Sequence, residues 1–218
     1  MSRESPLHLE PGLELLIEVS ACLAARDVRC LDSALTRAVE TCKPVEVEEG
    51  LLQSHLFLGY PAALTALARW RSIASMPAAD LDDLRSPERV DAWTHRGERV
   101  CERVYGRAYE KLRSNVARIH PAMDRCKDTE GYCKVLGRPG LDLRARELCI
   151  VAMLAVGGWE PQLHSHLRGA LHAGARPEAV EAALETGLRF AGKETIPSAR
   201  ALWRRVAHAH GSEAPGVR

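Results

Sequence analysis

Residues 138–185 read RPGLDLRARELCIVAMLAVGGWEPQLHSHLRGALHAGARPEAVEAALE, and this stretch decides the fold. Its apolar residues recur three and four positions apart, as on one face of an α-helix, and no part of it alternates with the two-residue period of a strand. Proline favours the first turn of a helix, and glycine favours the position just after its end. We therefore expect one helix over LRARELCIVAMLAV with Asp142 as its cap, a second over residues 161–174 and a third over residues 177–192.

The same helical spacing continues through most of the chain. Alanine, leucine, arginine and glutamate are abundant, while aromatic residues make up only 5% of the sequence, and this composition favours helix over strand. Pro44 is expected to begin a helix that ends near Leu58, Pro87 to begin another, and Pro197 to begin the last. The sequence therefore predicts an all-α protein.

The overall charge argues against a nucleic-acid or membrane partner. Lys and Arg number 30 against 29 Asp and Glu, so the chain lacks the basic excess of proteins that bind nucleic acid or anionic lipid. The first residues show no apolar core of a secretory signal, and the run LELLIEVSACLAA contains two glutamates and is too short to span a bilayer. We expect a cytoplasmic protein.

The cysteines are odd in number and scattered, without a C-x-x-C pair. Irregular spacing of this kind indicates free thiols in a reducing compartment better than a disulfide framework or a zinc site. We therefore expect thiols without chemistry of their own at all seven positions: Cys22, Cys30, Cys42, Cys101, Cys126, Cys133 and Cys149.

An internal repeat with an offset of 133 residues divides the chain. Matches in register pair Glu14 with Glu147, Ile17 with Ile150, Pro44 with Pro177, Val47 with Val180, Leu51 with Leu184, Gly59 with Gly192 and Trp70 with Trp203. Because neither copy could bury its apolar stripe alone, we expect the two to pack face to face as a pseudo-dimer. The predicted organisation is a degenerate first repeat over residues 1–76, a connector over 77–95 and a second domain over 96–218.

The opening stretch, with the lead-in HPAMDRCKDTEGYCKVLGRPGL, resembles the carboxymuconolactone decarboxylase family, which includes the alkylhydroperoxidase D-like proteins. The resemblance covers residues 98–208 and reappears in EVEEGLLQSHLFLGYPAALTAL of the first repeat. It implies an alkylhydroperoxidase D-like helical bundle, here internally duplicated, and a homo-oligomer, with a trimer favoured and a hexamer as the alternative. The chain departs from the family in its two copies and in GKETIP, where the family has a Gly-x-Pro turn.

The peroxidase branch of the family carries Glu, Cys, Cys and His, whose positions correspond here to Glu147, Trp159, Gln162 and His166. Disulfide-forming peroxide reduction needs a thiolate of low pKa and a resolving thiol beside it, and neither Trp159 nor Gln162 can supply one. A peroxidase would instead need two of three other cysteines within disulfide distance, namely Cys126, Cys133 and Cys149.

The decarboxylase branch also lacks these cysteines and has HLRAAL where this chain has HLRGAL from His166 onward. This similarity implies loss of CO2 from a small carboxylated lactone without a cofactor, with His166 as general acid and Glu147 orienting its ring. The reaction needs donors aimed at the oxyanion that develops on the lactone carbonyl, and an arginine for the substrate carboxylate. The residues expected to line the substrate site are Arg138, His120, Tyr132 and Trp159.

The histidines of the opening stretch do not form a metal site by helical geometry. His164 and His166 lie about 200° apart around a helix, and His164 and His172 lie about 12 Å apart along its axis, so they cannot share one ion. We expect no metal, and we expect His164 and His172 to face solvent.

Alternative interpretations stay open for both proposed catalytic residues. The first repeat has Ser33 at the position that matches His166, or Ala34 if the register slips by one, although it keeps Glu14 at the position that matches Glu147. A glutamate kept without its histidine fits a structural role, and the histidine alone fits a half-buried packing residue. The rival to an enzyme is therefore a non-catalytic scaffold or small-molecule binder that kept the fold. An enzyme predicts a partly closed pocket beside His166, and a scaffold predicts a packed histidine.

Overall fold

The computed structural model describes residues 9–76 and 87–213, and helices account for most of both segments. Proline begins several of the first helices, because its fixed backbone angle suits the first turn and its missing N–H has no partner there in any case. Gly59 ends α4 with a φ of 89°, a left-handed conformation that glycine adopts without strain. The helices of this segment are α1 (Pro11–Ala24), α2 (Val28–Thr41), α3 (Pro44–Gln53), α4 (His55–Leu58) and α5 (Tyr60–Ile73).

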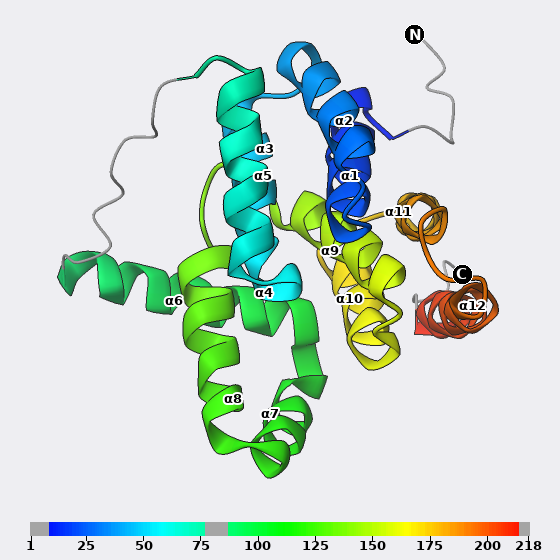
Figure 1. Ribbon diagram of the computed structural model, residues 1–218. Helices are drawn as coiled ribbons and strands as arrows, with labels where there is room; N and C mark the ends of the chain where they lie inside the picture. Colours follow the sequence, from blue (N-terminus) through cyan, green and yellow to red (C-terminus); the bar gives the residue numbers. More distant parts are fainter. Residues whose placement is uncertain (1–8, 77–86, 214–218) are drawn as a thin grey trace, which may run out of the picture.

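A middle group of helices follows, and Figure 1 shows α6 crossing the lower part of the molecule with α7 and α8 hanging below it. The side chain of His120 accepts a hydrogen bond from the Ala122 amide at 3.1 Å and so caps α8. The helix that begins at Pro121 continues beyond Cys126 with π-helical geometry. The bounds are α6 (Pro87–Tyr105), the 3₁₀ turn η1 (Gly106–Ala108), α7 (Tyr109–Ile119), α8 (Pro121–Cys126) and the π-helix η2 (Lys127–Leu136).

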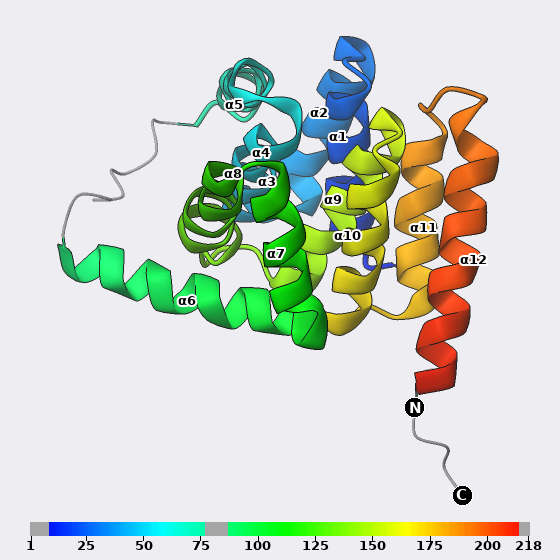
Figure 2. The same cartoon turned by 90° about the horizontal axis from the view of Figure 1, so that it is seen from below.

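The opening stretch of the sequence forms the next three helices, and a long helix closes the chain. The Asp142 side chain accepts from the Ala145 amide at 2.9 Å, so this residue caps α9 as expected. Figure 2 shows α10, α11 and α12 running side by side. The bounds are α9 (Leu143–Gly157), α10 (Glu160–His172), α11 (Pro177–Leu188) and α12 (Thr195–Glu213). No strand occurs in residues 9–76 or 87–213, and the all-α prediction is confirmed.

One predicted boundary is wrong by about a turn. The helix from Pro177 ends at Leu188 and does not continue toward Gly192. The amides of Phe190 and Ala191 bond three residues back, to the carbonyls of Gly187 and Leu188, which is the tight turn that ends many helices.

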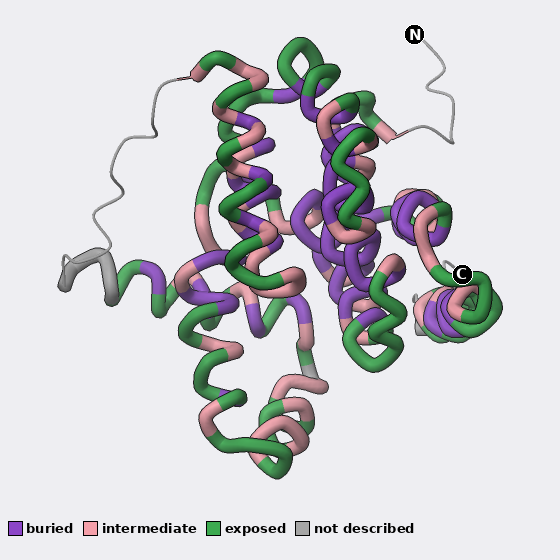
Figure 3. The backbone as a smooth tube through the Cα atoms, in the orientation of Figure 1, coloured by how far each residue is buried: buried purple, intermediate pink, exposed green. Residues whose placement is uncertain are grey.

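The centre of the molecule is α9, in which every residue from 145 to 155 is buried. A helix that is covered on all sides lies inside a protein, and α9 packs against α1, α10 and α11. Figure 3 shows the buried residues gathered on these central helices, whereas the described residues of α7 include no buried one. Two charged residues, Arg146 and Glu147, therefore lie in the most buried element of the fold.

The two series of helices repeat in order and spacing. The helices α1, α2 and α3 each begin 132 or 133 residues before α9, α10 and α11. The first helix of each series packs against the first helix of the other, and α1 also contacts α11 while α9 contacts α3. This reciprocal packing is the arrangement expected of two related units that share one core.

A buried ionic network links the two series. The Arg146 guanidinium, fully buried on α9, donates from Nη2 to Oε2 of Glu49 on α3 at 2.8 Å. Arg138 Nε donates to Oε1 of the same carboxylate at 2.9 Å. Burial lowers the pKa of Arg146, and its bonds to Glu49 oppose that change. Gln53 completes the network through bonds to the Arg146 side chain and carbonyl at 3.4 and 3.3 Å.

The prediction of seven free thiols is wrong for one pair. Cys22 and Cys30 form a disulfide with a Cα–Cα distance of 5.6 Å, and the other five cysteines are free. The bond forms because α1 turns directly into α2, with Arg26 in a left-handed conformation at φ 56°, so that residues eight positions apart meet across the turn. Spacing along the sequence could not show this, because the pairing depends on how sharply the chain reverses.

Within the described residues, no helix is both long enough and apolar enough to cross a membrane.

Candidate functional site

Glu147 and His166 meet in the core between α9 and α10. His166 Nδ1 lies 2.8 Å from Oε2 of Glu147, and the two side chains are 9% and 0% exposed. A carboxylate at this distance holds the ring orientation and fixes a proton on Nδ1. The other ring nitrogen, Nε2, is then the one that can exchange a proton with a ligand.

The walls around this pair come from both series of helices. The ring of Phe57, on α4, meets the His166 ring edge to face with centroids 5.5 Å apart. On the other side, a Cβ atom added at Gly169 would lie 2.8 Å from Oε2 of Glu147 and 2.9 Å from Cγ1 of Val104. The glycine therefore lets α6 and the carboxylate approach α10 more closely than any other residue would allow.

The second carboxylate oxygen of Glu147 is unsatisfied. Oε1 is buried and has no hydrogen-bond partner in the part of the chain that the structure describes. An unpaired buried oxygen of this kind is costly, and a bound hydroxyl, water or protonated group would satisfy it. Oε1 of Glu147 is therefore an acceptor that a bound ligand or water could use.

Two tyrosines lie within reach of the charge on Glu147. The hydroxyls of Tyr105, on α6, and Tyr132, on η2, form a hydrogen bond of 2.6 Å. Burial raises the pKa of both phenols, and the charge of Glu147 raises each further. Both stay neutral at physiological pH, so one hydroxyl donates to the other and the acceptor keeps its own proton for a ligand.

A surface pocket comes close to this group. It has a volume of about 250 Å³, and Val104 and Tyr105 form part of its wall together with Lys111, His164 and Arg168. Val104 and the Glu147 carboxylate both lie next to Gly169, and the charge of Glu147 acts on Tyr105, so this wall of the pocket lies near the carboxylate. Neither His166 nor Glu147 itself lines this pocket or the other three described for the chain.

The structure places the other predicted site residues apart from the pair, except Tyr132. Arg138 binds Glu49 in the buried network, so its guanidinium serves the contact between the two series. His120 is exposed and caps α8. Trp159 is 60% exposed at the start of α10, with its indole over Gly157. Each of these positions has a structural explanation that does not involve a ligand.

Sequence reasoning missed three residues that contact His166 or line the neighbouring pocket: Phe57, Tyr105 and Arg168. Arg168 was within reach, since it follows His166 by two positions in the HLRGAL motif. Phe57 and Tyr105 lie on helices far away in the sequence, and only the folded chain brings them to α10.

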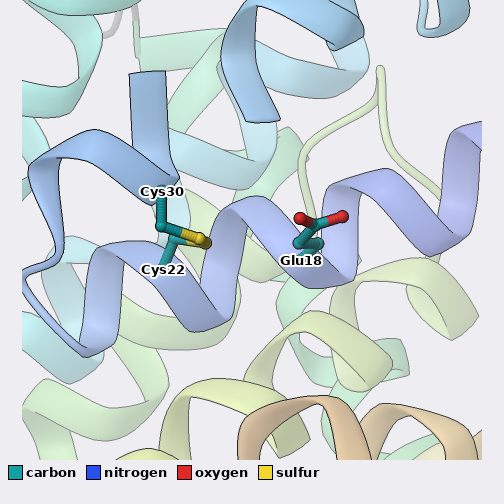
Figure 4. A group of neighbouring side chains, drawn as sticks. All are labelled: Glu18, Cys22 and Cys30. Carbon is teal, nitrogen blue, oxygen red and sulfur yellow. A yellow bond between two sulfur atoms is a disulfide. The ribbon is translucent and has the colours of Figure 1, made fainter. Parts of the chain in front are cut away.

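The described residues contain one group that has the composition of a metal site. The ligand atoms of Glu18, Cys22 and Cys30 lie within 4.8 Å of one another, and Figure 4 shows Glu18 and Cys22 on α1 with Cys30 reaching Cys22 from α2. The two sulfurs are bonded to each other, and Glu18 accepts a bond of 2.6 Å from Arg37. The disulfide and the ion pair therefore occupy all three potential ligands, and the group does not fit a metal ion while the disulfide is formed.

The free thiols do not resemble those of a peroxidase. Burial raises the pKa of Cys149 to about 11 and also raises that of Cys133, so both thiols stay protonated at neutral pH. Cys126 is exposed, and all three are free in the structure. The cysteine pair that a peroxidase would need is thus not formed by these residues.

The comparison with protein families covers the same helices that hold the pair. Residues 123–205 match the model of the carboxymuconolactone decarboxylase family, which includes α9, α10 and α11. The match confirms the expected resemblance to that family over these residues. The family match therefore contains Glu147 and His166, whereas Phe57 and Tyr105 come from outside it.

A curated relative extends the similarity over most of the chain. Peroxisomal protein 2 of Schizosaccharomyces pombe (strain 972 / ATCC 24843) is 24% identical over 196 residues, which are 84% of this chain and 92% of that protein. The similarity thus reaches beyond the family domain to both series of helices.

Proposed function

We propose that the chain is a carboxymuconolactone decarboxylase-like enzyme that acts on a small carboxylated, lactone-like molecule, with His166 as general acid. The observation that supports this proposal is the buried Glu147–His166 pair, with Nδ1 held at 2.8 Å and Oε1 of the glutamate left without a partner. A histidine that only fills space does not need a carboxylate buried beside it, because burying that charge is costly.

The proposed reaction breaks the bond between the substrate carbon and its carboxylate, which leaves as CO2. The electron pair of that bond moves into the lactone carbonyl, and the neutral Tyr105–Tyr132 pair supplies a hydroxyl donor next to the site for the resulting oxyanion. The imidazolium of His166 then delivers a proton from Nε2 to the carbon, and solvent restores that proton. Glu147 keeps the ring oriented through its contact with Nδ1.

The direct test is turnover of a panel of carboxylated γ-lactones, followed by CO2 release. His166→Asn is expected to lower kcat by a factor of about 10² or more, because general acids contribute on that scale. Glu147→Gln should also lower kcat, and His208→Asn, at an exposed position of α12, serves as the matched control. Equal turnover in His166→Asn and the parent chain would remove this histidine from the mechanism.

A non-catalytic binder is the second candidate, because none of the four described pockets is lined by His166 or Glu147. It predicts that no member of the panel is turned over while some members still bind. Measuring binding and turnover of each compound in parallel separates the two candidates.

Organisation and location complete the proposal. We propose a degenerate first repeat over residues 1–76, a second domain over 96–218 and assembly into a homo-oligomer, with a trimer favoured. The balanced charge suits a cytoplasmic protein, while the name of the Schizosaccharomyces pombe relative adds the peroxisome as a candidate location. Light scattering of the purified chain and imaging of a tagged copy test these two points.

A further inference from the structure

The outer face of α10 carries a row of basic residues, two histidines and one arginine, that the proposed chemistry does not use. His164, Arg168 and His172 follow one another at intervals of four residues, so they lie on one face of the helix. His166 lies between them in sequence but on the opposite, buried side. We call His164, Arg168 and His172 the α10 ridge.

Two pockets flank this ridge, and all three ridge residues line both of them. One pocket, of about 340 Å³, lies between α10 and α12 and is also lined by Arg205 and His210. The other, of about 250 Å³, lies toward α6 and α7 and is also lined by Lys111. The two pockets therefore share Arg168, and Arg205 and Lys111 add one further positive charge to each.

The charges that face these pockets are almost all of one sign. No Asp or Glu is among the residues that line either pocket, and Arg205 has Glu160 at 3.8 Å. Arg168 makes no hydrogen bond or ion pair with any residue that the structure describes, although it is only partly exposed. An arginine held in a pocket without a counter-charge has its donors free for an anion.

The two histidines of the ridge lie close to these positive charges. Burial lowers the pKa of His164, and the charges of Arg168 and Arg205 lower it further. His172 Nδ1 lies 2.8 Å from the Val104 carbonyl, to which it donates, so this bond holds the ring in place. The permanent positive charges at the pockets are therefore those of Arg168 on α10, Arg205 on α12 and Lys111 on α7.

We propose that the α10 ridge binds an oxyanion, a carboxylate or phosphate group, with Arg168 as the main ligand and Arg205 and Lys111 as flanking charges. The guanidinium presents a planar set of donors that matches two oxygens of either group. The site stands apart from the chemistry at His166, since a ligand could bind there in a protein without any turnover.

An NMR titration of the full chain tests the site without measuring activity. Inorganic phosphate and acetate are added separately at constant ionic strength, and the amide shifts of α10 and α12 are followed to saturation. We expect saturable shifts with at least one of the two anions. A stronger response to phosphate assigns a phosphorylated ligand, and a stronger response to acetate assigns a carboxylate.

Variants localise the binding. Arg168→Gln is expected to weaken it about tenfold or more, since a charge-assisted hydrogen bond contributes on that scale, and Arg168→Lys should restore part of the loss. Arg204→Gln removes a neighbouring exposed charge on α12 that lines neither pocket, and it should leave binding unchanged. Absence of saturable shifts with both anions, or an equal loss in Arg168→Gln and Arg204→Gln, would overturn the proposal.

Discussion

At the scale of the single residue, Gly169 determines how closely Glu147 and α6 can approach α10, which carries His166. The family has alanine at this position of the HLRAAL motif, but here an alanine Cβ would lie 2.8 Å from Oε2 of Glu147 and 2.9 Å from Val104. Both contacts are shorter than atoms tolerate, so the carboxylate and α6 must shift when the methyl group is added. The glycine is thus part of the geometry that places Glu147 against His166.

Gly169→Ala is therefore expected to lower the free energy of unfolding by about 1–3 kcal/mol and to weaken the Glu147–His166 contact. Gly50→Ala is the control, because a Cβ at Gly50 meets nothing within 4 Å and alanine favours the helix. That variant should be as stable as the parent or more so. Thermal unfolding and the side-chain NMR shifts of His166 measure both effects, and a neutral Gly169→Ala would contradict the described packing.

Cys126 and Cys149 should differ sharply in how fast they react with a thiol reagent, and in how that rate depends on pH. A raised pKa keeps a thiol protonated, and at a pKa of about 11 only about one Cys149 in a thousand is ionised at pH 8. Exposed Cys126 should react with iodoacetamide in the folded protein, while Cys149 should react only after unfolding or at much higher pH. Mass spectrometry of labelled peptides between pH 7 and 10 gives the answer, and equal labelling of both at pH 8 would show that Cys149 is not enclosed.

At the scale of the element, the short connection between α1 and α2 is held by a covalent bond. The Cys22–Cys30 disulfide closes a loop of eight residues in sequence separation, which corresponds to about 2–3 kcal/mol of stabilisation in the chain-entropy model.

Reduction with dithiothreitol should accordingly lower the melting temperature of the parent chain. Cys22→Ala/Cys30→Ala should start from that lower temperature and no longer respond to the reductant, and Cys126→Ala should behave like the parent. A parent chain without a Cys22–Cys30 cross-link by mass spectrometry would refute this expectation.

The contact between α3 and α9 depends on charge inside the core. Removing Glu49 would leave Arg146 buried without its counter-charge, and breaking a buried pair in this way costs about 3–5 kcal/mol. Glu49→Ala should therefore unfold at much lower denaturant concentration than the parent. Glu46→Ala on the same helix removes only an exposed pair with Lys43 and should cost less than about 1 kcal/mol. Similar losses in the two variants would contradict the described network.

At the scale of the whole molecule, the helical fold could be predicted because its signals are local. Asp142 caps α9, and prolines begin α1, α3 and α11, all from residues next to one another in sequence. The proximity of Glu147 and His166 was also accessible, since both sit on neighbouring helices at a spacing that the family motif keeps. Their catalytic role stays a prediction.

The rest of the site could not be predicted, because it depends on contacts between distant parts of the chain. Phe57 and Tyr105 reach the pair from α4 and α6, 109 and 61 residues before His166 in the numbering. The turn predicted that Arg138 faces a substrate cleft, and nothing local in the sequence shows that Glu49, 89 positions earlier, binds it. Long-range pairing of this kind leaves no periodic signal in a single sequence.

The Glu49–Arg146 contact also constrains how the chain can change over generations. Because each partner is buried and each needs the other, losing one alone exposes the core to an uncompensated charge. Sequences descended from a common ancestor should therefore keep both residues or replace both together, most easily by apolar side chains of similar volume. Positions 49 and 146 are thus expected to covary. This covariation would link the evolution of the two series of helices, even where the two repeats no longer resemble each other in sequence.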